Sequence, residues 1–333
     1  MLPRIEVSGS PFKIGLALGR AGRSAFMAGV LGGPDWRAVT DPRHALMIAR
    51  IAGQVQARFP AIWAEVKGLA EGLSLPLTDV FAWQCRGEVF ALEAADTPAE
   101  GCTTILSRHS LHHAEDGAPA LAGGCFLAAV TPEAAPAFLA FAYPGSLPGN
   151  GFAVTQAGLA LAVDDLRFRG LAPMMARCVL MRAALGARRL ADLRGLLTGA
   201  ACAGYHLAAL SVAEGRAAGF EFGAGALAEA RVEGAAAHAN HALIHPGGAQ
   251  GQWVSAESAA RLALAADRLR AGAAPETVIA CTEGGHPICK PTAPGGEGTQ
   301  TLALLSAHTQ GRDLIFAISD GVGIEAARGG WTL

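Results

Sequence analysis

The hydrophobic period of the sequence changes once, close to residue 101, and this change constrains the fold more than any other feature. Before it, apolar residues recur at helical spacing, first through Ile14, Leu18 and Phe26. Further helices are predicted at residues 42–59, 61–72 and 77–94, and turn-forming residues follow at 96–101. The first third of the chain is therefore predicted to be mainly helical.

After residue 101, short apolar segments alternate with Gly, Pro and Asp, which is typical of an antiparallel meander. The predicted strands are residues 102–107, 121–130, 137–142, 152–155, 159–163, 206–213, 216–222, 300–307 and 313–318. Helices are predicted between the strand groups at residues 173–185, 190–197 and 255–271, with Ser255 as the N-cap of the last one. Two strand groups with inserted helices fit an α+β fold of two stacked sheets covered by helices.

Composition limits what such a fold is expected to bind. Of the 333 residues, 51% are hydrophobic and 16% are charged, which is enough apolar surface for a large core and excludes a disordered chain. The net charge is -2 with both signs interspersed, and 6% of residues are aromatic. A nucleic-acid partner is therefore not expected.

Cysteine usage and hydropathy predict a cytoplasmic protein. The seven cysteines are odd in number and spread through apolar surroundings, so no disulfide framework is expected. The N-terminus lacks the pattern of a secretory signal, and no apolar run is long enough for a membrane span. We expect no membrane partner.

A cysteine, Cys102, lies where the Gly-containing turn runs into the first predicted strand. The tripeptide Gly101-Cys102-Thr103 is common, and a cysteine at a strand start is usually a small hydrophobic residue. Taken alone, this junction does not assign any chemistry.

The wider sequence gives the junction a context. The chain resembles the family of acyl-coenzyme A:6-aminopenicillanate acyltransferases, which are self-processing cysteine peptidases of the N-terminal-nucleophile superfamily. The resemblance follows the order and spacing of short segments at residues 5–15 with Gly19, 68–72, 83–88, 101–104, 157–163 and 238–241. It implies a four-layer αββα sandwich in one domain.

The resemblance also implies self-processing. The Cys102 thiol would attack the Gly101 carbonyl, and hydrolysis of the resulting thioester would leave fragments 1–101 and 102–333 as a heterodimer. The new α-amino group, with a reference pKa of about 7.7–8.0, would then be the general base for its own thiol. Cys102 would form a thioester with the acyl part of a substrate.

Four further residues are predicted to support this chemistry. Asn240 matches the family asparagine that donates to the oxyanion, although a turn-forming Asn is the alternative. Lys290 falls where a family arginine is expected, and a solvated loop lysine is the alternative. Arg167 and Arg169 flank Phe168 and are candidates for binding an anionic substrate group, against ordinary loop charges.

Two segments depart from the family pattern. The Asn-Trp-Asp motif of the family corresponds by count to Gly124-Cys125-Phe126, so the carboxylate that orients the α-amino group is missing, and Asp116 or Asp164 are candidates to replace it. Residues 164–166 also replace a run similar to Gly-Asn-Ser. These changes put the substrate and the efficiency of processing in doubt.

Other polar groups are assigned no chemistry. The histidines at positions 109, 112 and 113, with Glu115 and Asp116, are expected in a solvated hairpin tip, and neither they nor Cys281, His286 and Cys289 have a complete set of zinc ligands. The glycines of residues 295–298 are expected to let a loop approach the mouth of the active site. No metal is expected.

The function predicted from these observations is hydrolysis of a small N-acyl amine or a β-alanyl-type amide through a Cys102 thioester. The first alternative is acyl transfer to an amine, with a coenzyme A thioester as co-substrate and no other cofactor. The second is a non-catalytic binding protein, motivated by the missing carboxylate at Phe126. The expected partners are a small molecule and the cleaved fragment, and a higher oligomer is possible.

Overall fold

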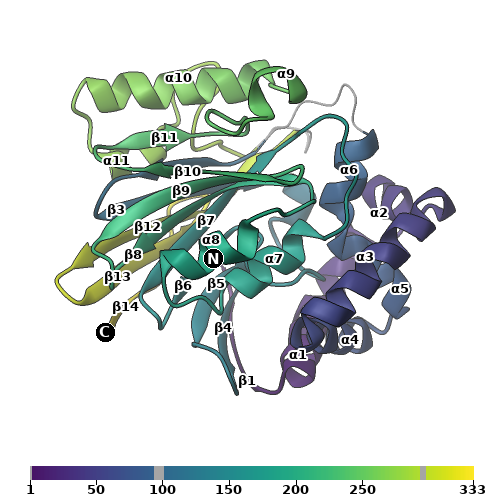
Figure 1. Cartoon of the computed structure of the whole chain (residues 1–333). Helices are drawn as coiled ribbons and strands as arrows, with labels where there is room; N and C mark the ends of the chain where they lie inside the picture. Colours follow the sequence, from purple (N-terminus) through teal and green to yellow (C-terminus); the bar gives the residue numbers. More distant parts are fainter. Residues whose placement is uncertain (1, 94–100, 293–297) are drawn as a thin grey trace.

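The structure, a computed structural model of the uncut chain, describes residues 2–93, 101–292 and 298–333. Two β-sheets are stacked face to face between two helical layers (Figure 1). This is the four-layer αββα sandwich that the resemblance implies.

The first sheet has eight strands within the described residues and is antiparallel except for the parallel pair β1–β4. Its strands, in spatial order, are β1 (Arg4–Gly9), β4 (Phe126–Pro132), β5 (Phe138–Ala142), β6 (Phe152–Thr155), β7 (Leu159–Leu166), β8 (Gly204–Ser211), β9 (Arg216–Gly223) and β10 (Ala226–Arg231).

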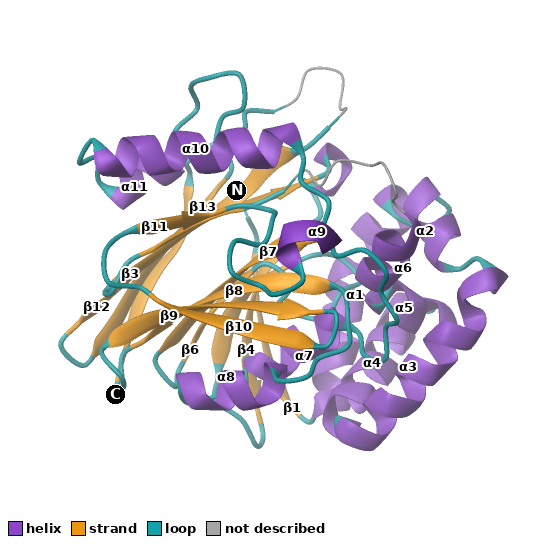
Figure 2. Ribbon diagram, turned by 45° about the horizontal axis from the view of Figure 1, so that its top comes forward, coloured by secondary structure: helices purple, strands orange, loops and turns teal. Residues whose placement is uncertain are grey.

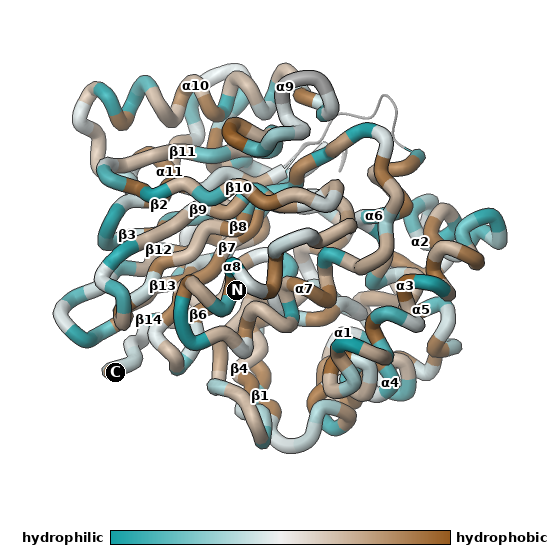
Figure 3. Tube along the Cα trace, viewed as in Figure 1, coloured by the Kyte–Doolittle hydropathy of each residue, from teal (hydrophilic) through white to brown (hydrophobic). Residues whose placement is uncertain are grey.

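The second sheet is antiparallel and has six strands within the same residues. They are, in spatial order, β11 (Ala236–His238), β2 (Thr103–Leu106), β3 (Ser110–Gly117), β12 (Gln300–Gln310), β13 (Asp313–Asp320) and β14 (Glu325–Thr332). The two sheets meet through apolar side chains such as Leu127, Phe141 and Phe152 of the first sheet and Leu305 and Phe316 of the second. Figure 3 shows hydrophobic residues along the strands between the helical layers.

One helical layer covers the outer face of each sheet (Figure 2). The layer on the first sheet contains α1 (Pro11–Gly29), α2 (Pro34–Val39), α3 (Ala45–Arg58), α4 (Pro60–Leu73), α5 (Leu77–Gln84), α6 (Arg86–Glu93), α7 (Arg177–Ala184) and α8 (Leu190–Leu197). The second sheet is covered by α10 (Ala256–Arg270) and α11 (Pro275–Ile279), and α9 (Gly248–Gly251) lies in the loop before α10.

Glycines allow α1 and α4 to pack closely. A Cβ at Gly15 would lie 1.8 Å from the Glu65 carbonyl oxygen, and a Cβ at Gly68 would lie 2.0 Å from the Phe12 carbonyl oxygen. Both distances are far below van der Waals contact, so only glycine fits at the crossing.

Most predicted elements are confirmed, including α10, whose N-cap Ser255 accepts a hydrogen bond from the Ser258 amide. The helix predicted at residues 77–94 is instead two helices, because the chain turns at Cys85 between α5 and α6. Within the described residues no helix is long and apolar enough to cross a membrane. The predicted turn at residues 96–100 lies outside the described residues.

The solvated hairpin tip predicted around the histidines was wrong for all but His109. Residues 110–117 form β3, and His112, His113, Glu115 and Asp116 are each at most 6% exposed. The strand was not predicted because most of its residues are polar, whereas buried strands are normally recognised by apolar residues. Only His109 lies in the exposed turn before β3.

Candidate active site

Cys102 lies immediately before β2 and is 8% exposed. The antiparallel register of β2 and β3, with Thr103 opposite Ala114, brings Cys102 next to the end of β3. The backbone N–H of Asp116 donates to the Cys102 Sγ at 3.5 Å. The sulfur therefore has a fixed position at the junction of two strands.

The cysteine opens onto a cavity of about 270 Å³. Gly101 and Asn240 also line the cavity. Aromatic side chains form part of its wall, and charged groups from both sheets and from α6 and α7 form much of the rest; these are Trp83, Phe90, Tyr143, Tyr205, Arg86, Glu115, Asp116, Asp165 and Arg177. A small organic molecule with polar groups fits such a space.

Arg261 of α10 holds the nucleophile strand and Asn240 together. Its side chain is completely buried. Nη1 donates to the carbonyl oxygen of Cys102 and to Thr103 Oγ1, and Nη2 donates to Asn240 Oδ1, each at 2.6 Å. No feature of the sequence distinguishes Arg261 from other helix arginines, so its role is visible only in the structure.

This arginine also determines which way the Asn240 amide faces. Because a guanidinium only donates, the atom in contact with it must be Oδ1, and Nδ2 points the other way. Among the described residues, the buried Nδ2 has no hydrogen-bond partner. A Cβ at Gly101 would lie 2.8 Å from this Nδ2. An unused donor therefore faces the peptide next to Cys102, which is the geometry needed to stabilise an oxyanion.

Lys290 reaches the site through Asp116. Its Nζ lies 3.2 Å from Asp116 Oδ2 and 2.7 Å from Thr299 Oγ1, and it also pairs with Glu257. Lys290 is 7% exposed, so it is not a solvated loop lysine. Burial raises the pKa of Asp116 above its ordinary value, although Lys290 and Arg261 act in the opposite direction.

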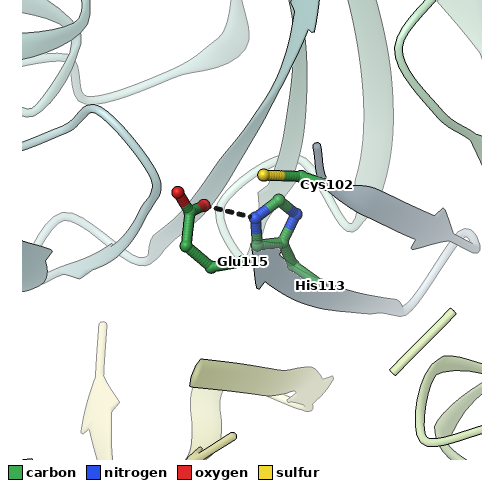
Figure 4. A group of neighbouring side chains, drawn as sticks. All are labelled: Cys102, His113 and Glu115. Atoms are coloured by element: carbon green, nitrogen blue, oxygen red, sulfur yellow. Dashed lines mark hydrogen bonds and ion pairs between the residues drawn. The ribbon is translucent and has the colours of Figure 1, made fainter. Parts of the chain in front are cut away.

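A second pair of ionisable groups lies beside the thiol. The Cys102 Sγ, a ring nitrogen of His113 and a carboxylate oxygen of Glu115 are all within 4.8 Å of one another. Figure 4 shows the three side chains pointing toward one another. His113 Nε2 is 2.8 Å from Glu115 Oε2, and Tyr143 donates its hydroxyl to the other carboxylate oxygen. Alternation along β3 puts positions 113 and 115 on the same face, so a strand assignment would have indicated this pair.

The neighbouring carboxylates affect the thiol itself. Burial raises the pKa of the Cys102 thiol well above its ordinary value, and the charges of Glu115, Asp116 and Asp164 raise it further. In the uncut chain the sulfur is therefore protonated at neutral pH. It needs a base before it can act as a nucleophile.

The sequence is similar to one known family. The family model for acyl-coenzyme A:6-aminopenicillanic acid acyl-transferase matches residues 106–314, which is more than half of the chain and begins just after Cys102. The chain belongs to this acyl-transferase family. Membership identifies it as an enzyme of an acyl-transferase family.

Comparisons with curated proteins and with solved structures do not identify the substrate. No curated protein matches the sequence. A solved structure of a mutant conjugated bile acid hydrolase from Clostridium perfringens is 10% identical, covering 70% of this chain and 92% of that chain, with a TM-score of 0.47. Similarity at this level carries no information about the substrate of this family member.

In this acyl-transferase family member, two carboxylates of β3 line the cavity beside Cys102, whereas position 126 offers none. Phe126 begins β4, and its side chain packs in the core between the first sheet and the helices. Glu115 has a carboxylate oxygen within 4.8 Å of the Cys102 Sγ, and Asp116, whose backbone N–H donates to that sulfur, lines the same cavity. The spacing of the family motif predicted the carboxylate at position 126, at the start of β4. In the structure, the strand next to the nucleophile is β3, which pairs with β2.

The two arginines predicted to bind substrate do not line the cavity within the described residues. Arg167 Nε lies 3.5 Å from Asp165 Oδ2, and the Arg169 guanidinium stacks 3.5 Å from the ring centre of Trp253. The arginines that line the cavity are Arg86 and Arg177. Substrate binding by residues 167 and 169 stays a prediction that the lining of this cavity does not support.

A polar network extends from Cys102 between the two sheets. Thr104 donates to Asp164 Oδ1 at 3.0 Å, and Asp164 Oδ2 is 2.9 Å from His206 Nδ1 and 3.5 Å from His238 Nδ1. His238 Nε2 lies 2.9 Å from Glu221 Oε1. Burial alone lowers the pKa of His238, but Asp164 and Glu221 raise it to about 9.

The carboxylate of Glu221 connects this network to the loop that follows Asn240. It accepts hydrogen bonds from the amides of Leu243, Ile244 and His245 at 2.7–2.9 Å. Burial alone raises the pKa of Glu221, but His238 and these amides lower it to about 2. An ionised Glu221 therefore holds the loop in place.

Two groups of side chains have the composition of metal ligands within the described residues: Cys102 with His113 and Glu115, and Asp164 with His206 and His238. In the second group the imidazole rings are stacked, 3.6 Å apart and inclined by 15°, so their nitrogen lone pairs do not converge on one point. Both ring nitrogens of His113 and of His238, and Nδ1 of His206, are used in hydrogen bonds. We assign both groups to hydrogen-bond networks. Of the glycine-rich loop, residues 295–297 lie outside the described residues.

Proposed function

We propose that this chain cuts itself between Gly101 and Cys102 and then hydrolyses a small amide through a thioester on Cys102. The observation that carries the proposal is the unpartnered Asn240 Nδ2, which faces Gly101 next to a buried thiol at the edge of a cavity. A donor fixed in this place serves an acyl carbonyl bonded to Cys102, whether it comes from Gly101 or from a substrate.

The same oxyanion donor would serve two successive reactions. In the first, Sγ attacks the Gly101 carbonyl and the peptide nitrogen leaves, and water then releases the carboxylate of Gly101. In the second, the thiol attacks the substrate amide, the amine leaves, and water hydrolyses the thioester. Arg261 supports both because it fixes the Asn240 amide and the Cys102 carbonyl in one arrangement.

After cleavage, the α-amino group of Cys102 is the proposed base for the thiol. Its reference pKa is about 7.7–8.0, so a substantial part of it is neutral near pH 7.5. Glu115 and Asp116 both line the cavity at Cys102, and their carboxylates are acceptors for the hydrogen bonds of an amine. We propose that Asp116, held by Lys290 and Thr301, orients the new amino group.

The cavity favours a small substrate with an anionic or carbonyl group. Arg86 lines it and has no ion-pair partner among the described residues, since its guanidinium contacts the Trp83 ring and carbonyl oxygen. Arg177, in contrast, pairs with Asp165. We propose that Arg86 binds an oxygen of an N-acyl amine or a β-alanyl-type amide.

The test uses purified full chain and a β-alanyl p-nitroanilide as probe. Acid quenching during turnover should trap an acyl group on a peptide that contains Cys102, detected by mass spectrometry, and Cys102→Ser should show no thioester. Adding a simple primary amine should leave the product unchanged in a hydrolase. An acylated amine as the main product would instead establish the transferase alternative, and absence of any Cys102 adduct despite turnover would reject the proposal.

A further inference from the structure

Self-cleavage needs a base that the mature enzyme does not need. In the uncut chain the nitrogen of Cys102 is part of the peptide bond with Gly101, so it is not a basic amine. Burial keeps the Cys102 thiol protonated, because its pKa is raised well above the ordinary value. Another group must therefore take the proton before Sγ can attack Gly101.

The groups in reach are His113 and Glu115. One atom of each lies within 4.8 Å of the Cys102 Sγ and of the other (Figure 4). His113 is fully buried and Glu115 is 3% exposed. Both project from β3, which is hydrogen-bonded to the nucleophile strand β2, so their positions relative to the sulfur are fixed by the sheet.

The neighbouring hydrogen bonds show where the protons are. Asp164 is ionised, since His206 and His238 hold its pKa low against the effect of burial, and so it only accepts. The single hydroxyl hydrogen of Thr104 therefore goes to Asp164 Oδ1, and the Thr104 oxygen must accept from His113 Nδ1–H at 2.9 Å. This leaves His113 Nε2 facing Glu115 Oε2 at 2.8 Å, with one proton shared between them.

The His113–Glu115 pair holds one proton between Nε2 and Oε2, and it can accept a second proton. With the second proton it becomes an imidazolium and a carboxylic acid, and its net positive charge then faces the new thiolate. The pKa of His113 agrees with this, because burial lowers it but Glu115, Asp164 and Asp116 raise it above its ordinary value. Tyr143, which donates to Glu115 Oε1, keeps that carboxylate in place.

We propose that the His113–Glu115 pair is the proton acceptor for the Cys102 thiol during self-cleavage. The thiol proton moves to the pair and Sγ bonds to the Gly101 carbonyl carbon, while Asn240 Nδ2 donates to the oxyanion. The C–N bond then breaks, and the pair returns the proton to the Cys102 nitrogen. Water hydrolyses the thioester to the Gly101 carboxylate and a free thiol. This inference rests on the proposed function, since it requires the Gly101–Cys102 cleavage.

The test compares cleavage rates of variants in the full chain, followed by intact mass spectrometry. His113→Gln and Glu115→Gln should each slow cleavage roughly 100-fold or more, the usual contribution of a positioned base. His112→Gln is the matched control, because His112 is the adjacent buried histidine of β3 and bonds Ser306 on the opposite face of the sheet. It should cleave within about 3-fold of wild type.

Two readouts separate loss of a base from loss of structure. The same substitutions in a Cys102→Ala background, which stays uncut, should unfold cooperatively with circular dichroism spectra like that of the parent. Residual cleavage of Glu115→Gln should rise about tenfold per pH unit, because hydroxide replaces the missing base. Asp116, Asp164 and Tyr143 also face the pair, and they are unchanged in this variant.

The outcomes distinguish this inference from the function on which it rests. If wild type never cleaves, the proposed function fails. If wild type cleaves and a folded His113→Gln or Glu115→Gln chain cleaves equally fast, the pair is not the base and only the inference is overturned. Slow cleavage of Glu115→Gln with no pH dependence would also overturn it.

Discussion

Arg261 donates a hydrogen bond to the carbonyl oxygen of Cys102 at 2.6 Å, although the two residues are 159 positions apart in the sequence. The contact crosses from the helical layer into the second sheet and ends at the nucleophile. Since the same guanidinium also bonds Asn240 Oδ1, a single buried side chain sets the position of the nucleophile relative to its oxyanion donor.

Replacing the Arg261 guanidinium should therefore lower both the stability of the fold and the rate of reaction at Cys102. Arg261→Lys keeps the charge near Glu257 but cannot reach Cys102 and Asn240 together. We expect a loss of about 1–3 kcal/mol in the free energy of unfolding, because at least one buried acceptor loses its partner. Urea unfolding in the Cys102→Ala background measures this. Arg268→Lys, on the same helix and paired with Glu283 at the surface, should leave the free energy of unfolding unchanged within error.

The oxyanion role of Asn240 is best tested with Asn240→Asp. A carboxylate still accepts from Arg261, so the fold should be kept, but no donor then faces the reacting carbonyl. Cleavage and kcat should each fall at least about 100-fold, as when a single oxyanion donor is removed. Unchanged rates in a folded variant would return Asn240 to a structural role.

The fold was largely predictable because its elements follow ordinary periodicity. Helix α10 has apolar residues at helical spacing and strand β13 has buried residues at alternate positions, and the change of period at residue 101 marks where helices give way to sheets. The strand β3 was missed because its buried face carries His113 and Glu115 instead of apolar residues. A functional strand breaks the pattern by which strands are recognised.

Residues of the site were predictable only where they lie in a recognisable sequence motif. Cys102 stands in a recognisable motif, and Lys290 and Asn240 were found by resemblance, although their roles stay predictions. Arg261 belongs to no motif, and Arg86 lies in a segment that resembles the family but was assigned no role there. Only the packing of their helices brings them to the cysteine or the cavity. Long-range contacts of this kind leave no signal in a single sequence.

The buried network of His238 and Glu221 should give the stability an optimum pH, with losses at both higher and lower pH. His238 has a folded pKa of about 9, above its ordinary value of 6.5, so its contribution is complete below about pH 6.5 and is lost as the pH rises toward 9. Glu221, with a pKa of about 2, contributes above about pH 4.5 and loses its contribution as the pH falls toward 2. Stability should therefore be highest between about pH 5 and 6.5.

Thermal unfolding of the Cys102→Ala chain measures this dependence. The parent chain should lose stability between pH 6.5 and 9. His238→Gln should remove the part of this loss that comes from His238, at most about 3 kcal/mol. His109→Gln, in the exposed turn before β3, should leave the profile unchanged. Equal slopes in the His238→Gln and parent chains would show that His238 is not charged in the folded protein.

Substrate binding distinguishes the arginines of the cavity from those predicted by sequence. Arg86→Gln should raise KM for an amide substrate roughly tenfold or more, because a charged hydrogen bond is lost, with a smaller effect on kcat. Arg169→Gln should leave both constants unchanged, since Arg169 stacks on Trp253 away from the residues that line the cavity. The reverse pattern in steady-state kinetics would restore the prediction made from the sequence.

The most direct test of the account is intact mass spectrometry of the purified protein after incubation at neutral pH. We predict two masses, one for residues 1–101 and one for residues 102–333 with Cys102 as its first residue, and a single uncut mass for Cys102→Ala. A single full-length mass for the wild-type chain after long incubation would contradict self-cleavage, and with it the α-amino base proposed for the mature enzyme.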